Sequence, residues 1–214
     1  MTYMIVTGGE SRAFPSGESF LEQAAADADI VLYLGGAKLR ANAHKAAILV
    51  ELGHECLGVH TGEGGGTDAG EEGSNILGFN RYRNGDDEPS NLIELVRQPR
   101  TEETALLAAK ALFEAAGFDV AVCSDQAGRI IDRLVQPKYN AALRFLDEGL
   151  ASAKDMDLTC RMGLGYPEGP IERVCRGGLA TQHDITQALF ETYGTPGYAP
   201  ARRAMVAKQR AARE

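Results

Sequence analysis

The stretch SNILGFNRYRNGDD, residues 74–87, places a polar side chain at the end of an apolar run. Residues 76–79 predict a strand, and the chain becomes charged and rich in turn formers from Asn80 onward. Reacting groups of α/β enzymes commonly lie at such strand ends. The amide of Asn80 has no pKa in the range that general-base catalysis requires. The position therefore does not supply proton transfer.

Two stretches are rich in glycine, and neither has the form of a nucleotide-binding motif. A dinucleotide fingerprint needs G-x-G-x-x-G between the first strand and a helix, so that the pyrophosphate approaches the helix N-terminus. Here Gly8 and Gly9 are followed by Glu10, whose carboxylate would face the phosphates. Residues 62–73 are rich in acid as well as glycine and lack the Gly-Lys-Ser/Thr end of a P-loop. The sequence therefore predicts no cofactor-binding residue, and a solvated loop at 62–73.

Composition places the chain among globular proteins of one large domain or two small ones. Its 214 residues are 44% hydrophobic, and the formal net charge of −8 argues against non-specific binding to nucleic acid. No apolar run reaches the ~18 residues of a membrane span, and the N-terminus lacks a signal-peptide pattern. No metal site is expected, and no two cysteines are spaced as CxxC. We therefore expect a cytoplasmic protein with reduced core thiols at Cys56, Cys123, Cys160 and Cys175.

Hydrophobic periodicity in the first part of the chain alternates between strand and helix. Strands are expected at 1–7, 29–36, 54–60, 75–80, 90–98 and 118–125, and helices at 19–28, 37–53 and 101–117. The continuous apolar run within 29–36 is typical of a strand buried on both faces. Ser19 is a possible N-cap and Gly53 a helix stop. This alternation predicts a mostly parallel sheet with covering helices over residues 1–124.

From Asp125 onward the pattern changes to helices alone. Apolar residues recur at helical spacing over 126–152, where Pro137 is expected to kink the helix. Further helices are expected at 153–163, 171–178 and 181–194. We therefore place a domain boundary between an α/β domain, residues 1–124, and an all-α domain, residues 125–214.

Three blocks of the helical part share their residue types and spacing with a known family. The first two blocks lie on the long helix and its approach: Asp125, Gly128, Arg133, Pro137, Asn140 and Ala141. The third is the box GLGYPEGPIE, residues 163–172, which is followed by YGTPGYAP. In these blocks the chain resembles the C-terminal domain of the 3-hydroxyacyl-CoA dehydrogenases. We expect the prolines and glycines of the box to shape a helix crossing.

Upstream the resemblance is weaker, and it lacks the family's first strand–helix–strand unit. The chain is similar to the reduced Rossmann version of the family, which forms the second half of duplicated 3-hydroxybutyryl-CoA dehydrogenases of the phenylacetate-degradation type. There the first half carries NAD and the chemistry, and the second half packs against it. The resemblance thus implies a reduced Rossmann-like α/β domain followed by an all-α dehydrogenase C-terminal domain.

The resemblance also implies four site positions. The family's catalytic His corresponds to Asn80, and the Glu that orients this His corresponds to Glu94. The family's Asn on the long helix is replaced by Asp132, whose charge would oppose a developing oxyanion, and its substrate-binding Ser falls near Gly62. Because an amide cannot take the hydroxyl proton during hydride transfer, we interpret Asn80, Glu94 and Asp132 as degenerate catalytic positions.

A surviving activity would need another base. His60 ends a predicted strand beside Gly62 and is the histidine closest to the former site, so it is the candidate. The remaining histidines are expected at the surface or as helix caps: His44, His54 and His183.

Three functions stay open at this stage. The chain is a degenerate, non-catalytic or accessory subunit of fatty or aromatic acid β-oxidation, with no cofactor of its own. Alternatively, it is an active NAD-dependent 3-hydroxyacyl-CoA dehydrogenase, alone or with a partner. As a third possibility, it binds acyl-CoA without redox chemistry, and Arg81, Arg83 or Lys138 contact the phosphates.

Self-association is expected in each case, as a homodimer or as a hetero-oligomer with a full dehydrogenase. The family's helical domain buries an apolar face between subunits. The corresponding apolar residues here are Leu134, Val135, Leu143, Phe145, Leu146 and Leu150.

Overall fold

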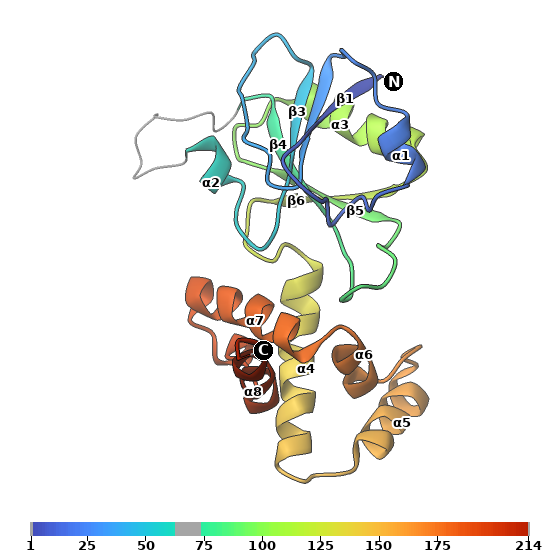
Figure 1. Ribbon diagram of the computed structural model, residues 1–214, viewed down its shortest axis with the longest axis vertical. Helices are drawn as coiled ribbons and strands as arrows, with labels where there is room; N and C mark the ends of the chain where they lie inside the picture. Colours follow the sequence, from blue (N-terminus) through green and yellow to red (C-terminus); the bar gives the residue numbers. More distant parts are fainter. Residues whose placement is uncertain (1, 63–73, 214) are drawn as a thin grey trace. The chain divides into compact units, whose positions relative to one another are not determined.

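The computed structural model describes residues 2–62 and 74–213, and these form two compact units (Figure 1). The N-terminal unit comprises residues 1–83 and 89–129, and the C-terminal unit comprises residues 84–88 and 130–214. The division after Arg129 lies a few residues beyond the boundary expected at 124/125. The short segment 84–88 is the one part of the first half that belongs to the second unit.

A six-stranded sheet forms the centre of the N-terminal unit. Its strands are β1 (Tyr3–Thr7), β2 (Ile30–Leu34), β3 (Ala47–Glu51), β4 (Ile76–Arg81), β5 (Leu92–Arg97) and β6 (Asp119–Ser124). The strands lie side by side in chain order, and all neighbours are parallel except β4 and β5, which are antiparallel. The predicted α/β class with a mostly parallel sheet is confirmed.

Both faces of the sheet are covered, which explains the continuous apolar strands. Helix α3 (Glu103–Ala115) and the short α1 (Ser19–Glu22) cover one face, where an aromatic cluster packs. That cluster joins Phe14, Phe20, Phe79, Phe113 and Phe118. On the other face, side chains of β2, β3 and β4 pack with residues that follow β2 and β3, among them Ala37, Leu52 and Leu57.

Two predicted elements between β2 and β4 are wrong. Residues 37–53, expected as a helix, contain β3, because the apolar run 47–50 lies between two parallel neighbours. Residues 54–60, expected as a strand, contain the helical turn α2 (Gly58–Thr61). This turn starts where the carboxylate of Asp125 accepts hydrogen bonds from the amides of Leu57 and Gly58, at 2.7 and 2.8 Å. Such a long-range cap leaves no local signal.

The helix expected at 19–28 is also shorter than predicted. It ends at Glu22, and Ser19 is its first residue and not its N-cap. The reason lies in β1, because the amide of Ala25 donates to the carbonyl of Tyr3 at 2.7 Å and draws the chain into an extended path. The predicted loop 63–73 lies outside the described residues.

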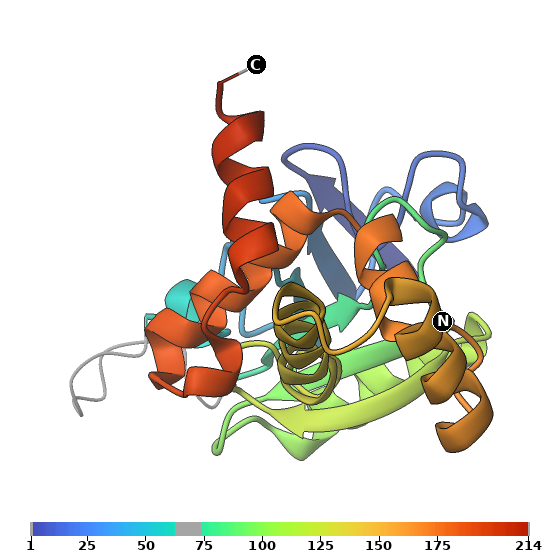
Figure 2. The ribbon, with the colours of Figure 1, turned by 90° about the horizontal axis from the view of Figure 1, so that it is seen from below.

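The C-terminal unit is all helical. Its elements are α4 (Ile131–Asp147), α5 (Ala153–Leu164), α6 (Pro170–Arg176), α7 (Leu179–Tyr193), the 3-10 turn η1 (Pro196–Tyr198) and α8 (Arg202–Ala211). Helix α4 is central, with α6 on one side and α7 and α8 on the other (Figures 1 and 2). The helices expected from the sequence are confirmed, and α8 was not predicted.

Pro137 lies inside α4, and the C-terminal part of the unit compensates for its missing N–H. A proline leaves the carbonyl four residues earlier without its helical donor. Here the hydroxyl of Tyr198 donates to that carbonyl, on Arg133, at 3.4 Å. One turn later, the buried amide of Asn140 donates to the carbonyls of Gly197 and Ala199, both at 3.1 Å. The segment containing η1 is thereby fixed along α4.

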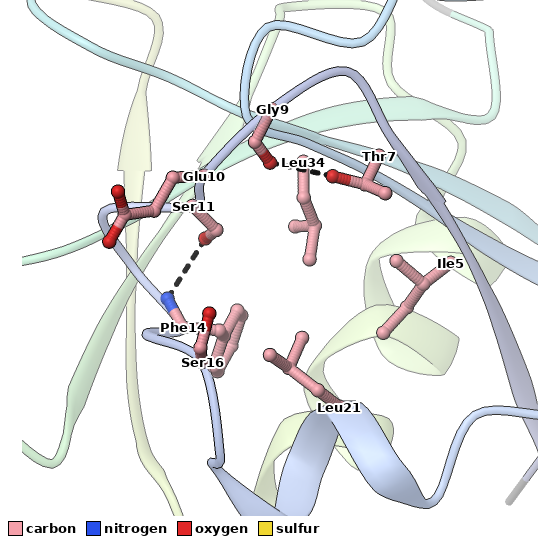
Figure 3. Close-up of a pocket in the computed structure, with 9 residues that line it drawn as sticks. All are labelled: Ile5, Thr7, Gly9, Glu10, Ser11, Phe14, Ser16, Leu21 and Leu34. Atoms are coloured by element: carbon pink, nitrogen blue, oxygen red, sulfur yellow. Dashed lines mark hydrogen bonds between the residues drawn. The ribbon is translucent and has the colours of Figure 1, made fainter.

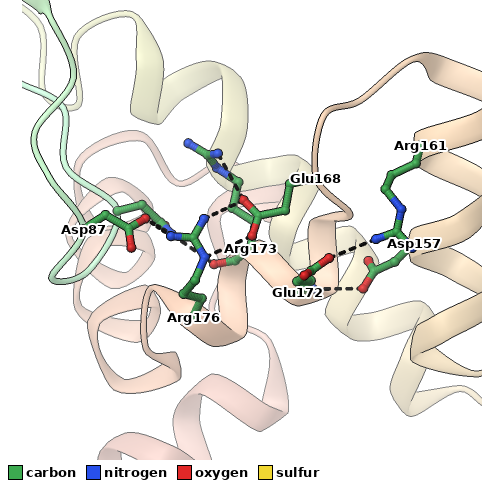
Figure 4. A network of polar contacts seen from close by, with 8 residues as sticks. Asp87, Asp157, Arg161, Glu168, Glu172, Arg173 and Arg176 are labelled. Carbon is green, nitrogen blue, oxygen red and sulfur yellow. Dashed lines mark hydrogen bonds and ion pairs between the residues drawn. The ribbon is translucent and has the colours of Figure 1, made fainter.

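The box at 163–172 joins α5 to α6 through a side-chain cap. The carboxylate of Asp157, in α5, accepts hydrogen bonds from the amides of Ile171 and Glu172 at 2.8 and 3.0 Å, which satisfies the free N-terminus of α6 (Figure 4). Gly169 precedes the helix, and a Cβ at this position would overlap the Asp157 carboxyl group. The box therefore has an architectural role.

Charged pairs surround this junction. Arg161 pairs with Glu172 at 2.9 Å, and Arg176 pairs with both Glu168 and Asp87 (Figure 4). Asp87 belongs to the segment 84–88, so these pairs hold that segment within the C-terminal unit.

Three further expectations from the sequence concern membrane-spanning helices, metal ligands and the burial of the cysteines. Within the described residues, no helix combines the length and apolarity that a membrane span requires, and no three His, Cys, Asp or Glu side chains are grouped as metal ligands. All four cysteines are free thiols, but none is fully buried, so the expectation of core thiols is wrong: Cys56, Cys123 and Cys160 are half-buried and Cys175 is exposed.

The junction generates a stability prediction. Gly169→Ala forces the Asp157 carboxylate away from the start of α6, and we expect it to lower the free energy of unfolding by about 3 kcal/mol. Gly163→Ala is the matched control, because nothing lies within 4 Å of its Cβ position, within α5. That change should be neutral or stabilise by up to about 1 kcal/mol. Urea unfolding followed by circular dichroism measures both, and equal effects would contradict the capping role.

Candidate functional site

Asn80 and Glu94 lie directly opposite each other on the antiparallel strands β4 and β5. Glu94 is 1% exposed, and Asn80 is half-buried. Strand alternation points both toward the face that carries Val96 and α2. The structure thus brings together two of the predicted positions. The pair places an amide and a carboxylate at opposite positions of the two strands.

The pKa of Cys123 shows the influence of burial and of the Glu94 charge on this part of the sheet. It lies opposite Val96 on β6, on the same face as Glu94. Burial and the charge of Glu94 raise the pKa of the Cys123 thiol to about 11, although the charge of Arg129 acts in the opposite direction. A thiol with this pKa stays protonated near neutral pH and is a poor nucleophile. The surroundings therefore disfavour additional negative charge.

His60 lies in α2 and forms a pair with Glu55. The His60 Nε2 and Glu55 Oε1 atoms are 3.1 Å apart, and both side chains are half-buried. Burial acts to raise the Glu55 pKa, but hydrogen bonds from His60 and from backbone amides, together with the His60 charge, lower it to about 2. An imidazole that a carboxylate orients can act as a proton acceptor. In the described part of the chain, no hydrogen bond joins His60 to Asn80.

Gly62 ends α2 in the left-handed conformation, with φ +78°, and its amide donates to the carbonyl of Gly58 at 3.0 Å. This geometry explains a glycine at the position without reference to substrate. The residues that follow it are not described, so its substrate-binding role stays a prediction.

Arg81 is buried within the N-terminal unit. Its guanidinium donates to the carbonyls of Ser90 and Ala13, at 2.5 and 3.1 Å, and pairs with Glu18. It also lies against the ring of Phe118, 4.8 Å from the ring centroid. These contacts account for Arg81 without a ligand. Because Arg81 is buried and has these partners, the structure gives no support to the phosphate-binding role predicted for it.

The other predicted positions have partners inside their own units. The backbone carbonyl of Arg83 accepts a hydrogen bond from Arg12 at 3.0 Å in the N-terminal unit. In the C-terminal unit, Asp132 is buried and accepts from Gln136 at 3.0 Å. Lys138 is exposed, and its ammonium lies 4.3 Å from the centroid of the Tyr166 ring. Lys138 is thus the predicted phosphate ligand that is most accessible to solvent.

Sequence reasoning missed Glu51, the last residue of β3. Its carboxylate accepts hydrogen bonds from the hydroxyl of Ser11 at 3.0 Å and from the amides of Ala13 and Gly35 at 2.7 and 2.8 Å. The loops after β1 and β2 therefore meet at one side chain at the end of β3. An acid directly after the apolar run 47–50 was a usable signal, but the helix assigned to 37–53 concealed it.

A hollow of about 290 Å³ adjoins this meeting point (Figure 3). Its apolar side is formed by Ile5, Phe14, Leu21 and Leu34. Its polar rim includes Thr7, Glu10, Ser11 and Ser16. The Ser11 hydroxyl, which donates to Glu51, also accepts from the amide of Phe14 at 2.9 Å (Figure 3).

The carboxyl edge of the parallel strands does not fit the pyrophosphate of a dinucleotide. Dinucleotides bind in the crevice at a point where the strand order reverses, and the order here runs from β1 to β6 without reversal. The donors of the loop after β1 bind Glu51, and Glu10 adds a second carboxylate at the rim of the hollow.

The helical unit is the part of the chain that matches a known family model. Residues 128–214 match the family model of the 3-hydroxyacyl-CoA dehydrogenase C-terminal domain. The chain is 33% identical over 110 residues to a 3-hydroxybutyryl-CoA dehydrogenase of Mycobacterium tuberculosis, which covers 51% of this chain and 38% of that protein. It is 32% identical over 100 residues to the human mitochondrial hydroxyacyl-coenzyme A dehydrogenase, which covers 47% of this chain and 32% of the relative.

The fold extends the likeness to both units. The crystal structure of FadB2 from M. tuberculosis superposes with a TM-score of 0.72 at 20% identity, covering 87% of this chain and 67% of that one. At this identity the match shows a shared fold. The chain spans between about a third and two fifths of the length of the two relatives matched by sequence.

The Glu55–His60 pair generates a prediction for acid stability. The folded pKa of Glu55 is lowered from 4.5 to about 2, so its contribution is present above pH 4.5 and is lost as the pH falls toward 2. Glu55→Gln removes this titration. Between about pH 5 and about pH 2.5 we expect the free energy of unfolding of wild type to fall by roughly 1–2 kcal/mol more than that of the variant. The difference is smaller than the full pKa shift would give, because solvent screens part of the pair.

Urea unfolding at a series of pH values measures this difference. Glu22→Gln, on the exposed side of α1, is the control and should follow wild type. An acid loss in Glu55→Gln equal to that of wild type would contradict the lowered pKa.

Proposed function

The chain belongs, through its helical C-terminal domain, to the 3-hydroxyacyl-CoA dehydrogenase family, and we propose that it is a non-catalytic, accessory subunit of that family. In this role it binds no NAD of its own and works in fatty or aromatic acid β-oxidation. The free thiols agree with the cytoplasmic location expected from the sequence.

The observation that carries the proposal is the pairing of Asn80 with Glu94. Oxidation of a 3-hydroxyacyl group needs an acceptor for the hydroxyl proton as well as one for the hydride. The strand end offers an amide where the resemblance places the imidazole, and this amide lies opposite the buried Glu94. At the carboxyl end of β3, the donors of the neighbouring loops bind Glu51. This arrangement supports the proposal that the chain binds no hydride acceptor of its own.

The second candidate is an active NAD-dependent 3-hydroxyacyl-CoA dehydrogenase, alone or with a partner. The observation in its favour is the Glu55–His60 pair, which supplies an oriented imidazole after β3. An acyl-CoA-binding module without redox chemistry is a further alternative, for which Lys138 is the exposed cation.

The partner of the accessory subunit is a second copy or a full dehydrogenase. The structure revises which apolar residues could contact it, because Leu143 is fully buried in the helical core and Val135 and Leu146 pack against that core. Exposed apolar residues remain on α4, on α5 and near their ends: Leu134, Phe145, Leu150, Leu158, Met162 and Leu164. Such exposure is typical of a protein–protein contact face.

Cofactor binding and turnover test the proposal. Titration of NADH, followed by its fluorescence, should give no saturable signal in the micromolar range, with a full-length 3-hydroxybutyryl-CoA dehydrogenase as positive control. Reduction of acetoacetyl-CoA should also be absent, and Asn80→His should not restore it, because the strand edge still lacks a dinucleotide site.

Turnover by the wild-type chain would contradict the accessory role. In that event His60→Ala, with His183→Ala as control, decides whether the Glu55–His60 pair supplies the base. Binding of acetoacetyl-CoA in calorimetry without turnover, abolished by Lys138→Ala, would favour the binding module.

Exposed residues of α5 generate a prediction for assembly. Leu158 and Met162 are four residues apart, so they share one face of the helix. We expect the wild-type chain to sediment as a dimer at micromolar concentration and Leu158→Glu/Met162→Glu to sediment as a monomer, because burying two carboxylates opposes association. Val59→Glu, at an exposed apolar residue of the N-terminal unit, should remain dimeric. A monomeric wild type would contradict the proposed face.

A further inference from the structure

The loops that follow β1 and β2 direct three donors at a single anion. Ser11 and Ala13 belong to the first loop and Gly35 to the second, and the anion is the carboxylate of Glu51, at the end of β3. All three donor–acceptor distances lie between 2.7 and 3.0 Å. This is the hydrogen-bond set of a bound carboxylate or phosphate, filled by a group of the chain itself.

The donors are held in place by contacts other than those to Glu51. Gly35 has φ +57°, and a Cβ there would overlap the backbone of Gly9, so the two loops touch through their main chains. The Ser11 hydroxyl is fixed from its other side by the amide of Phe14, at 2.9 Å. Ala13 is 1% exposed, and its carbonyl accepts from Arg81 at 3.1 Å. The donor set therefore does not require Glu51 for its geometry.

The charge of Glu51 is met by neutral donors. In the described part of the chain, no Lys, Arg or His forms an ion pair with it. Two backbone amides and a hydroxyl can stabilise an anion at this place without a countercharge, as at the anion-binding turns of other proteins. Arg81, which pairs with Glu18, donates to the carbonyl of the Ala13–Phe14 peptide, and the N–H of this same peptide donates to the Ser11 hydroxyl.

We propose that the loops after β1 and β2 form an anion-binding site at the end of β3, that the Glu51 carboxylate is its resident occupant, and that the site takes a phosphate or small carboxylate when this side chain is removed. The site adjoins the hollow beside β1, because Ser11 belongs to both. The inference goes beyond the accessory role and does not depend on it, since it concerns an anion and not turnover or NAD.

Chemical rescue tests the proposal. Glu51→Ala leaves three donors unpaired, and in chloride we expect its melting temperature to fall by about 4–10 °C. Acetate or inorganic phosphate at tens of millimolar should restore about 3–6 °C in a saturable way, at constant ionic strength. Calorimetry with the same anions should give a millimolar dissociation constant for Glu51→Ala and no heat above buffer for wild type.

Two variants separate site binding from a general salt effect. Glu51→Gln has lost the charge but still fills the site with an amide, so it should be destabilised and should not be rescued. Glu10→Ala removes the same charge from the loop after β1 without removing an acceptor of the three donors, so it should melt like wild type and show no rescue.

The outcomes are decisive in either direction. Rescue confined to Glu51→Ala supports the site. If Glu51→Ala is unfolded in chloride, recovery of its folded circular dichroism signal in acetate or phosphate gives the same support. Equal anion effects on Glu51→Ala and Glu51→Gln, an unchanged melting temperature for Glu51→Ala, or failure of every anion to stabilise or recover it would overturn the proposal.

Discussion

The hydrogen bonds of the Glu51 carboxylate connect the carboxyl ends of the first three strands of the N-terminal unit. Parallel strands leave backbone amides of the following loops without strand partners, and the loops after β1 and β2 here share one acceptor at the end of β3. In a nucleotide-binding sheet a ligand phosphate supplies negative charge at this edge. Glu51 supplies it covalently at the end of β3. The same contact uses the donors that a cofactor would need.

In the C-terminal unit, side chains likewise form hydrogen bonds with backbone groups that have no partner within a helix. Asp157 caps α6, Asn140 binds the carbonyls around η1, and Tyr198 serves the carbonyl that Pro137 leaves without a donor. Each of these hydrogen bonds involves at least one residue within, or next to, the sequence blocks that carry the family resemblance. The similarity of this unit to known dehydrogenases therefore follows from architecture, and it is compatible with either presence or loss of activity.

The sequence predicted elements whose signal is local and missed those whose cause is distant. Periodicity was sufficient for β2, β4, β5, β6, α3 and the helices of the C-terminal unit through α7. It failed at β3, because a short apolar run suits a buried strand or a buried helix equally well, and at α2, because the cap on this turn comes from Asp125. Asn80 and Glu94 could be linked through the resemblance. Glu51 could not, since its role requires the ends of three strands to be known.

Asn80 and Glu51 support separate parts of the proposed accessory role. Asn80 concerns the proton of the substrate hydroxyl, and Glu51 concerns the edge where a hydride acceptor would bind. They lie on different strands, so a change at one leaves the other obstacle in place. An imidazole at the strand end would still face a sheet with no reversal of strand order. The proposed accessory role therefore rests on the sheet as well as on a single side chain, as expected of a subunit that contributes structure and contact surface.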